Sequence, residues 1–296
     1  MTATTELDLR RRFFAEELEA ICKLRSPRLV EAFATVAREK FLGPGPWTVM
    51  ADADFMMPGQ PPLQVRMRTT PDADPSRVYH NITVAIDPAR TLFNGQPGTL
   101  AVWIDALDLA PGARVLHIGA GTGYYTAVLA HCVGPSGRVV AFEVDEALAA
   151  EARANAASVP WVEIRHGDAA TPVDGAFDAI VVNAGVTHPL AWWLDALAAG
   201  GKMVLPLTGT MPGMGTIGKG VVLLITSDGE QFAARALTMV AVYSAIGLRN
   251  DDMNARLGKA LMTGPMQWAA ITKVRRDPHE PASTCWFHGE GFCIST

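Results

Sequence analysis

Apolar and polar positions follow two alternating periods through the middle of the chain. Five short apolar runs of strand length lie at 114–118, 138–143, 161–165, 177–182 and 201–206. Between them, apolar residues recur every three or four positions, as is typical of helices, at 123–133, 146–157 and 189–198. This order predicts an α/β fold with a Rossmann-like, doubly wound, mostly parallel sheet.

The pattern changes after this core. The apolar runs 221–226 and 232–243 flank Ser227-Asp228-Gly229-Glu230. An Asp-Gly pair between two apolar runs is a strong hairpin signal. We therefore predict that the sheet ends in an antiparallel C-terminal hairpin.

Segments with helical spacing precede the core at 5–23 and 27–41, so the chain should begin with N-terminal helices. An extension follows the core; it is rich in large apolar residues and should pack on the core or across a homodimer interface, with Trp286 as an anchor. The predicted regions are an N-terminal helical and irregular substrate-side region at 1–90, the Rossmann-like core at 91–248 and the C-terminal extension at 249–296.

Three glycines, Gly119, Gly121 and Gly123, follow the first strand of the core and lead into a helix. Glycines let the backbone approach a ligand closely, and the free amides of a helix N-terminus suit a carboxylate. The dinucleotide-binding spacing G-x-G-x-x-G would place its third glycine at 124, but that residue is Tyr124. The spacing therefore favours S-adenosylmethionine, whose methionine part carries a carboxylate.

Polar residues at later strand ends complete the predicted cofactor site. The carboxylate of Glu143, at the end of the second strand, can accept hydrogen bonds from ribose hydroxyls. Asp168 is placed to accept from the adenine amino group, and Asn183 ends the fourth strand where substrates meet the cofactor. The residues predicted to bind the cofactor are Gly119, Ala120, Gly121, Thr122, Gly123, Tyr124, Glu143, Val144, Gly167, Asp168, Ala169 and Asn183.

Composition narrows the range of partners. The net charge is -5 and no stripe of Lys or Arg is visible, so we expect no nucleic acid partner. No stretch approaches the roughly 20 apolar residues of a membrane span, and no secretory signal is apparent. We expect no membrane association and a cytoplasmic location, where the four scattered cysteines would be reduced thiols.

Cys285, His288 and Cys293 lie close together near the C-terminus. They provide three potential zinc ligands without a fourth, and no two cysteines form a C-x-x-C pair. We therefore predict no metal site and interpret this segment as a C-terminal strand.

Several motifs resemble a known family. They are Val36-Ala-Arg-Glu-Lys-Phe41, the glycine loop with Tyr124, Phe177-Asp-Ala-Ile180 and Ala199-Gly-Gly-Lys-Met-Val-Leu-Pro206. Over roughly residues 5–245 the chain resembles the class I methyltransferases, and specifically the protein-L-isoaspartate O-methyltransferases. The resemblance implies carboxyl O-methylation of a peptide, protein or small acid, with S-adenosylmethionine as donor and S-adenosylhomocysteine as product.

One loop departs from the family pattern. In the protein-L-isoaspartate O-methyltransferases, the loop before the glycine motif carries Ser-x-Pro-His-Met and helps to hold the isoaspartyl substrate. The hydroxyl and the imidazole are both missing from the matching, substrate-side residues, and the insertions at 47–76 and 209–218 also look foreign to the family. An altered acceptor is therefore expected. The substrate-side residues are Gly95, Gln96, Pro97, Gly98 and Thr99.

The predicted chemistry needs no general base, because a carboxylate with a pKa of about 4 is already ionised at neutral pH. The enzyme would then contribute mainly proximity and alignment. Two alternatives stay open: a small-molecule or peptide O- or N-methyltransferase of natural-product biosynthesis, and a cofactor-binding protein without turnover. The candidates for a catalytic role are Asn183, Gln96, His188 and Tyr125.

Overall fold

The computed structural model describes residues 5–50, 67–210 and 216–296.

The helix predicted at 189–198 is shorter in the structure: α6 covers Ala191–Asp195, because Leu197 already pairs with Phe177 of the neighbouring strand. α4 (Tyr124–Val133) and α5 (Glu146–Ala156) connect the first strands of the parallel half. That half consists of β5 (Arg114–Ile118), β6 (Arg138–Glu143), β7 (Val162–His166), β8 (Phe177–Val182) and β9 (Leu197–Gly209).

An antiparallel hairpin follows, formed by β10 (Ile217–Ser227) and β11 (Phe232–Tyr243). Its turn is held by Asp228, whose carboxylate accepts hydrogen bonds from the amides of Glu230 (2.9 Å) and Gln231 (2.7 Å). Because β10 is antiparallel to both β9 and β11, β11 runs in the same direction as the parallel strands. The end of β11 therefore lies at the same edge of the sheet as the ends of β5 and β8.

The C-terminal extension continues this sheet. Its elements are α7 (Asp251–Leu261), α8 (Pro265–Ala269), β12 (Lys273–Arg275), β13 (Cys285–Gly289) and β14 (Phe292–Ser295). Phe287, Phe292 and Ile294 are buried in the same apolar cluster as the core strands. Trp286 is only half-buried, and its indole N–H donates to the Thr263 hydroxyl at 3.2 Å.

Arg249 connects the extension to the core. Its half-buried guanidinium donates to the Gly185 carbonyl (2.7 Å), to the Thr208 carbonyl (2.8 Å) and to Oδ1 of Asn254 (2.7 Å). Burial lowers the pKa of Arg249. These bonds fix the first helix of the extension against β9.

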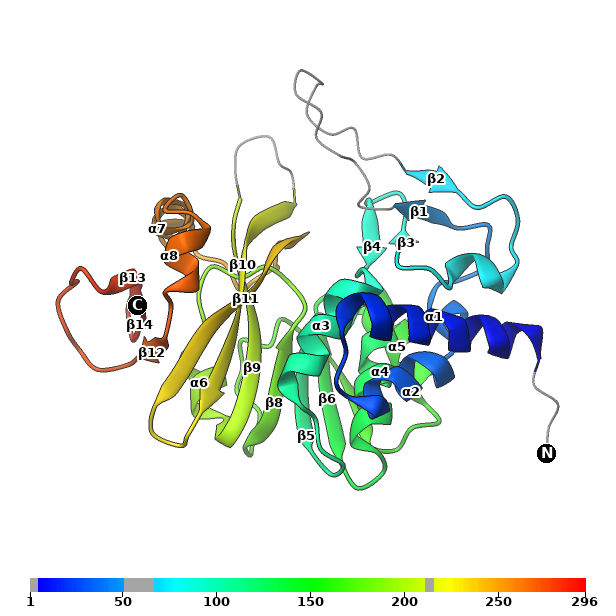
Figure 1. Cartoon of the computed structure of the whole chain (residues 1–296), viewed down its shortest axis with the longest axis horizontal. Coiled ribbons are helices and arrows are strands. Elements are labelled where there is room, and N and C mark those ends of the chain that lie inside the picture. Colours follow the sequence, from blue (N-terminus) through cyan, green and yellow to red (C-terminus); the bar gives the residue numbers. More distant parts are fainter. Residues whose placement is uncertain (1–4, 51–66, 211–215) are drawn as a thin grey trace, which may run out of the picture.

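Within the described residues the main sheet has ten strands, in the order β13-β14-β12-β11-β10-β9-β8-β5-β6-β7 (Figure 1). The predicted Rossmann-like α/β fold, with parallel core strands and an antiparallel C-terminal hairpin, is confirmed. Figure 1 shows the extension at the end of the sheet opposite the N-terminal helices. No helix in the described ranges is long and apolar enough to cross a bilayer.

The predicted N-terminal helices form an outer layer over α3 (Pro97–Leu107) and α4, the helices that pack on the sheet. The N-terminal helices are α1 (Glu6–Cys22) and α2 (Pro27–Thr35), which pack on each other and on α3 and α4. Phe14, Phe33 and Trp103 are fully or almost fully buried in this layer, so its stability comes from the burial of large apolar surfaces.

A second, small sheet stands beside the main one, with the strand order β2-β1-β3-β4. A 3-10 helix at Arg38–Phe41 supplies Arg38, which is fully buried and donates to the carbonyls of Val78 (2.7 Å) and Ile82 (2.8 Å). These bonds hold in place the segment 78–82, which leads into β3. The strands are β1 (Thr48–Met50), β2 (Arg68–Thr69), β3 (Thr83–Asp87) and β4 (Leu92–Asn94), and a 3-10 helix covers Pro75–Val78. Residues 51–66 and 211–215 of the two predicted insertions lie outside the described residues.

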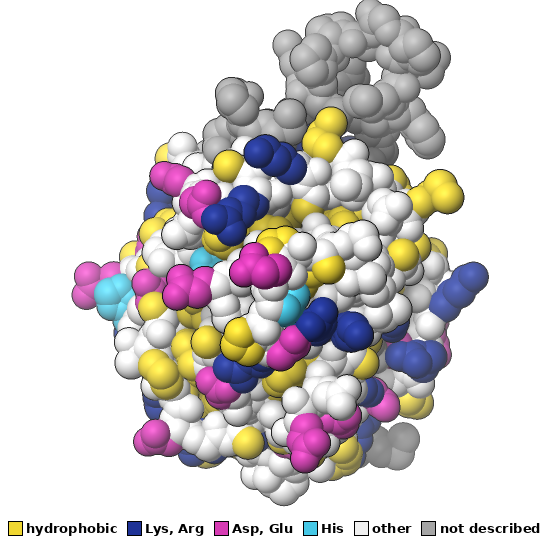
Figure 2. All heavy atoms as spheres, turned by 90° about the vertical axis from the view of Figure 1, so that its left-hand side faces the viewer, with side chains coloured by type: hydrophobic (Ala, Val, Ile, Leu, Met, Phe, Trp, Pro, Cys, Tyr) yellow, Lys and Arg dark blue, Asp and Glu magenta, His cyan; other side chains and the backbone are white. Residues whose placement is uncertain are grey.

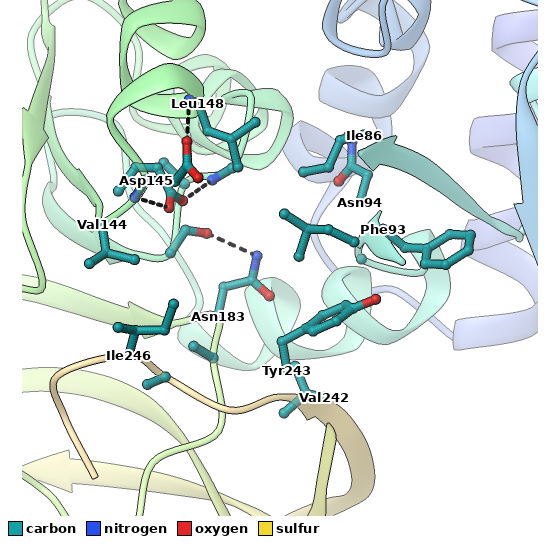
Figure 3. A pocket seen from close by; sticks show the side chains of 18 of the residues that line it. Ile86, Phe93, Asn94, Val144, Asp145, Leu148, Asn183, Val242, Tyr243 and Ile246 are labelled. Carbon is teal, nitrogen blue, oxygen red and sulfur yellow. Dashed lines mark hydrogen bonds between the residues drawn. The ribbon is translucent and has the colours of Figure 1, made fainter. Parts of the chain in front are cut away.

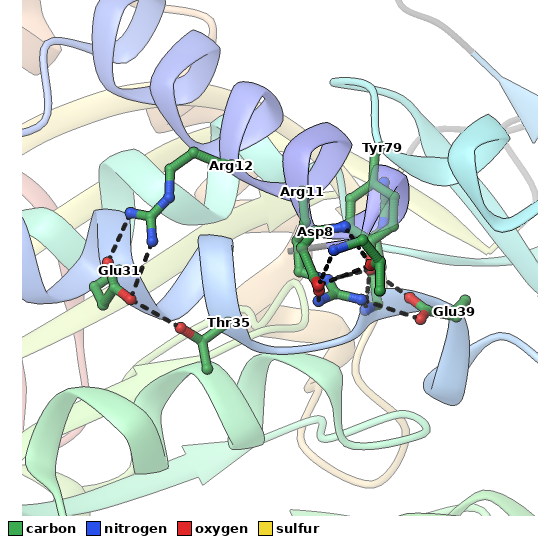
Figure 4. A network of polar contacts seen from close by, with 9 residues as sticks. Asp8, Arg11, Arg12, Glu31, Thr35, Glu39 and Tyr79 are labelled. Atoms are coloured by element: carbon green, nitrogen blue, oxygen red, sulfur yellow. Dashed lines mark hydrogen bonds and ion pairs between the residues drawn. The ribbon is translucent and has the colours of Figure 1, made fainter. Parts of the chain in front are cut away.

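A buried tyrosine joins α1 to this region (Figure 4). The hydroxyl of Tyr79 accepts from Nε of Arg11 (2.9 Å) and from the backbone amide of Arg38 (3.1 Å), and it donates to Glu39. Burial and the Glu39 carboxylate raise the pKa of Tyr79 to about 12.

Candidate functional site

The glycine loop between β5 and α4 uses backbone conformations that other residues rarely adopt. Gly119 has φ +85° and Gly123, the N-cap of α4, has φ +95°. A Cβ on Gly119 would lie 3.0 Å from the backbone carbonyl oxygen of Asn183. The loop can therefore lie close against the end of β8 only because residue 119 has no side chain.

A cavity of about 290 Å³ opens beside this loop (Figure 3). The ends of β5, β6 and β8 form one side, and the β3–β4 hairpin and the segment after β11 form the other. Its size is close to the lower end of the range for small-molecule sites, about 300–1,000 Å³. The lining residues are Ile86, Arg90, Leu92, Phe93, Asn94, Gly95, Gly119, Ala120, Gly121, Glu143, Val144, Asp145, Leu148, Asn183, Ala184, Thr216, Val242, Tyr243, Ser244, Ala245 and Ile246.

Glu143 is held rigidly in the cavity wall. Its side chain is almost fully buried, and the two carboxylate oxygens accept from the amides of Gly121 (2.6 Å) and Asp145 (3.0 Å). Each carboxylate oxygen has a further lone pair. The group can therefore accept two more hydrogen bonds from a ligand, as a pair of neighbouring hydroxyls would donate.

Two asparagine amides also face the cavity. Asn183 donates from Nδ2 to the Gly119 carbonyl at 3.3 Å, which leaves its Oδ1 on the cavity side (Figure 3). Asn94 is buried, and its Nδ2 has no hydrogen-bond partner among the described residues. Asn94 therefore contributes a neutral amide to the cavity wall, but its Nδ2 atom is closed off from the cavity space.

Sequence reasoning missed the wall opposite Glu143. This wall consists of residues of the β3–β4 hairpin, including Phe93 and Asn94, and of residues 242–246. The Tyr243 hydroxyl donates to the Thr91 carbonyl and so joins the two parts of the wall. Asn94 directly precedes the substrate-side loop at 95–99, and this position was the only feature of the sequence that could have indicated its place in the cavity wall.

Seven of the predicted site residues line the cavity: Gly95, Gly119, Ala120, Gly121, Glu143, Val144 and Asn183. Thr122, Gly123 and Tyr124 lie behind the loop, where Tyr124 packs against Phe33 and Phe41. Gly167, Asp168 and Ala169 lie outside the lining set; Asp168 accepts from the Ala170 amide (2.9 Å) and lies beside Gly247.

The substrate-side loop forms the start of α3. Gln96 is its N-cap and donates from its side chain to the Asn81 carbonyl (3.3 Å), and Pro97 is the first helical residue. The Gly98 amide donates to Oδ1 of Asn81 at 2.7 Å. A Cβ on Gly98 would lie 2.8 Å from Nδ2 of Asn81, so Asn81 occupies the space that a larger residue would need. Within the loop, only Gly95 lines the cavity; Gln96, Pro97, Gly98 and Thr99 do not.

The remaining catalytic candidates also lie away from the cavity. His188 stacks on Phe292 of the extension, with ring centroids 6.2 Å apart, and burial lowers its pKa. Tyr125 is fully buried, donates its hydroxyl to the Gly95 carbonyl and has a pKa raised by burial. Of the four candidates, only Asn183 reaches the cavity.

Charged groups at the cavity mouth are already paired. Arg90 forms ion pairs with Asp87 (2.6 Å) and with Asp145. Asp145 also caps α5 through the Leu148 amide (3.0 Å), and this bond, together with Arg90, lowers its pKa. These pairs join the end of β3 to the start of α5 across the mouth.

A family model described as protein-L-isoaspartate(D-aspartate) O-methyltransferase matches residues 66–218. Among curated relatives, the protein-L-isoaspartate O-methyltransferase of Methanopyrus kandleri is 30% identical over 197 residues, which cover 65% of this chain and 74% of the relative. Protein-L-isoaspartate O-methyltransferase 1 of Rhodopseudomonas palustris is 33% identical over 210 residues (69% and 71%). The Methylorubrum populi enzyme of the same name is 33% identical over 216 residues (72% and 83%).

Solved structures show the same fold. A protein-L-isoaspartate O-methyltransferase superposes with a TM-score of 0.60 and 24% identity, over 80% of this chain and 67% of that one. A Plasmodium falciparum protein, described as a putative enzyme of this kind in complex with S-adenosyl-L-homocysteine, has a TM-score of 0.57 and 18% identity over 80% of this chain and 98% of that one.

Proposed function

The chain belongs to the protein-L-isoaspartate(D-aspartate) O-methyltransferase family and is an S-adenosylmethionine-dependent methyltransferase, and from this we propose that it methylates a carboxylate of a peptide or protein in the cavity beside the glycine loop. The observation that carries this proposal is the absence of a general base among the described lining residues. Their titratable groups are Arg90, Glu143, Asp145 and Tyr243.

None of these four groups is suited to take a proton from an acceptor. Glu143 is bonded to two amides, Arg90 and Asp145 form an ion pair, and burial raises the pKa of Tyr243. An amine or hydroxyl acceptor would need a base to become nucleophilic. A carboxylate is ionised at neutral pH without one.

The residues present fit the cofactor. We propose that the 119–121 loop takes its methionine part, that Glu143 accepts from the ribose hydroxyls, and that Val144 borders the adenine. We also propose that Asp168 accepts a hydrogen bond from the adenine amino group. Asp168 lies beside Gly247, and the preceding residue, Ile246, lines the cavity. When bound, S-adenosylmethionine supplies an activated methyl group on its sulfonium.

The chain's own residues orient the acceptor. We propose that Phe93, Asn94 and Asn183, which line the cavity, border the acceptor carboxylate. One carboxylate oxygen would be the nucleophile for the methyl group that the bound cofactor would supply, and the transfer would need no proton acceptor. Alignment of this kind contributes on the order of 7–11 kcal/mol to lowering a barrier.

The acceptor is expected to differ from an ordinary isoaspartyl residue. Gly95 and Gly98 provide no hydroxyl or imidazole, and Asn81 occupies the space beside Gly98. Ile86 and Arg90 of the N-terminal region line the cavity, so we propose that residues 1–90 help to select the acceptor. A cytoplasmic location is part of the proposal, because all four cysteines are unpaired, as is usual in a reducing compartment.

Transfer of radiolabelled methyl groups tests the proposal. Two peptides of the same sequence would be tested as acceptors, one with an aspartyl and one with an isoaspartyl residue at the same position. A mixed peptide pool would be tested beside them. Carboxyl methyl esters release methanol in mild base, whereas N-methyl groups and methyl ethers do not. We expect base-labile label; base-stable label would refute carboxyl methylation, and cofactor binding without any transfer would favour the non-catalytic alternative.

The variant Asn94→Asp tests the role of Asn94. It replaces the neutral amide in the cavity wall with a carboxylate, which should repel a carboxylate acceptor and reduce kcat/KM at least tenfold. The matched control is Asn250→Asp at the N-cap of α7, since the exposed Asn250 accepts from the Met253 amide, as an aspartate also can, and does not line the cavity. Equal loss of activity in both variants would argue against an Asn94 contact with the acceptor.

A further inference from the structure

Four metal-binding side chains meet in the C-terminal extension, at the end of the molecule that Figure 2 faces. They are His279, from the loop between β12 and β13, Cys285 and His288 on β13, and Cys293 on β14. One donor atom from each lies within 4.8 Å of the others. The sequence showed three of these donors as neighbours, and the structure adds His279 as the fourth.

A strand irregularity brings the three strand residues to one face. Side chains alternate along a strand, so Cys285 and His288, three positions apart, would normally point to opposite faces. The register of β13 against β14 shifts between Cys285 and Phe287, which inserts one extra residue. Cys285 and His288 therefore share a face, and Cys293, directly opposite His288, joins them.

His279 reaches the cluster from an exposed loop. Of residues 276–284, only His279 is not exposed. Its Nδ1 lies 2.7 Å from the Asp277 carbonyl oxygen, which can only accept, so Nδ1 carries the proton. Its Nε2 therefore presents a lone pair and lies 3.5 Å from Sγ of Cys285. A ring nitrogen fixed in this way by a carbonyl is the usual outer contact of a metal-bound histidine.

The donor set and its dimensions suit one metal. Tetrahedral zinc has Zn–N and Zn–S bonds of about 2.0–2.3 Å, which place neighbouring ligand atoms roughly 3.3–3.8 Å apart. The His279–Cys285 distance of 3.5 Å is within this range. Nδ1 of His288 is buried and has no hydrogen-bond partner among the described residues, and Sγ of Cys285 accepts from the Ala282 amide at 3.3 Å. Two thiolates and two neutral imidazoles would balance the charge of a divalent ion.

We propose that His279, Cys285, His288 and Cys293 form a structural Zn²⁺ site that fixes the 276–284 loop to the β13–β14 hairpin. Four protein ligands leave no open position for a substrate, so the site is structural and not catalytic. None of its residues lines the cavity beside the glycine loop, and the inference does not depend on the proposed function.

The metal content of the full-length chain tests the proposal. The protein would be purified without chelators, and its zinc content would be measured by inductively coupled plasma mass spectrometry. We expect about one zinc per chain in the wild type, and at most a tenth of that in Cys285→Ser and His279→Gln. The matched controls are Cys22→Ser and His80→Gln, which lie outside the cluster and should retain the zinc.

Cobalt titration of the wild-type chain, after zinc removal, keeps the test valid if a ligand variant does not fold. Tetrahedral Co²⁺ bound by thiolates shows intense visible bands and a thiolate charge-transfer band. The proposal is overturned if the wild type binds neither metal, if the ligand variants keep the zinc of the controls, or if Cys285 and Cys293 are joined as a disulfide in the purified protein.

Discussion

At the residue scale, Glu143 connects the glycine loop to the start of α5. Its carboxylate accepts from Gly121 and Asp145, so the group is oriented before any ligand arrives. An oriented carboxylate loses little freedom on binding, which is why one side chain can contribute strongly to affinity.

We expect Glu143→Gln to weaken binding of S-adenosylhomocysteine about 10- to 150-fold, because hydrogen bonds to a charged group contribute about 1.5–3 kcal/mol. The glutamine amide would also place a donor against the Gly121 or Asp145 amide. Calorimetric titration measures the effect. Glu151→Gln, on the exposed face of α5, is the matched control and should bind normally. Unchanged affinity in Glu143→Gln would remove Glu143 from the cofactor site.

Tyr79 gives a pH-dependent expectation. Its pKa is raised from 10.0 to about 12, so the fold prefers the neutral phenol. The stability contributed by Tyr79 is then fully present below about pH 10 and is lost as the pH rises towards about 12. We expect Tyr79→Phe to lower the free energy of unfolding at neutral pH by about 1.5–3 kcal/mol.

Denaturant titrations between neutral pH and about pH 12 measure this effect. The difference in unfolding free energy between wild type and Tyr79→Phe should shrink as the pH rises through that range. A difference that stays constant would mean that the Tyr79 hydroxyl does not titrate differently in the folded chain.

At the element scale, the start of α3 is packed around a glycine. Gly98→Ala would place a Cβ within 2.8 Å of Asn81, and overpacking of this kind costs about 1–3 kcal/mol. The matched control is Gly258→Ala in α7, where a Cβ meets no atom of the described residues within 4 Å. The control should instead stabilise the chain, by about 0.4–1 kcal/mol. Thermal unfolding of both variants measures the contrast, and equal shifts would contradict it.

The order of strands and helices was predictable because each element between 114 and 206 has a clear period of its own. The glycine loop and Glu143 were equally visible, since both follow directly from strand ends. The opposite wall was not predictable: Thr91 and Tyr243, which join it, are 152 positions apart. His279 was not predictable as a metal ligand for a similar reason. It reaches the cysteines from a loop, and a strand irregularity turns Cys285 and His288 to one face; neither feature leaves a periodic pattern in the sequence.

At the scale of the whole molecule, the extension covers β11. Its strand β12 hydrogen-bonds to the start of β11 at Phe232 and Ala233, and Phe287 and Phe292 are buried against core residues. Removing residues 249–296 would leave an open strand edge beside an apolar surface, and such an edge pairs readily with other chains.

We expect the chain without 249–296 to aggregate or to lose roughly 6–20 °C in Tm. Removing one buried aromatic costs about 3–5 kcal/mol, and each kcal/mol lowers Tm by about 2–4 °C in domains of comparable size. Size-exclusion chromatography and calorimetry check this expectation. A monodisperse truncated chain with the Tm of the wild type would show that the extension is dispensable for stability.

The contact between Tyr243 and Thr91 has a consequence for synthesis on the ribosome. Glu143 and the glycine loop are made before residue 150, so this part of the cavity leaves the ribosome well before the opposite wall. The cavity, by contrast, stays open on one side until the segment after β11 emerges and joins the hairpin that was made 152 residues earlier. A nascent chain that stalls before that point would present the ligand-binding edge without its second wall, and the emergence of residues 242–246 would be the step that first encloses a ligand.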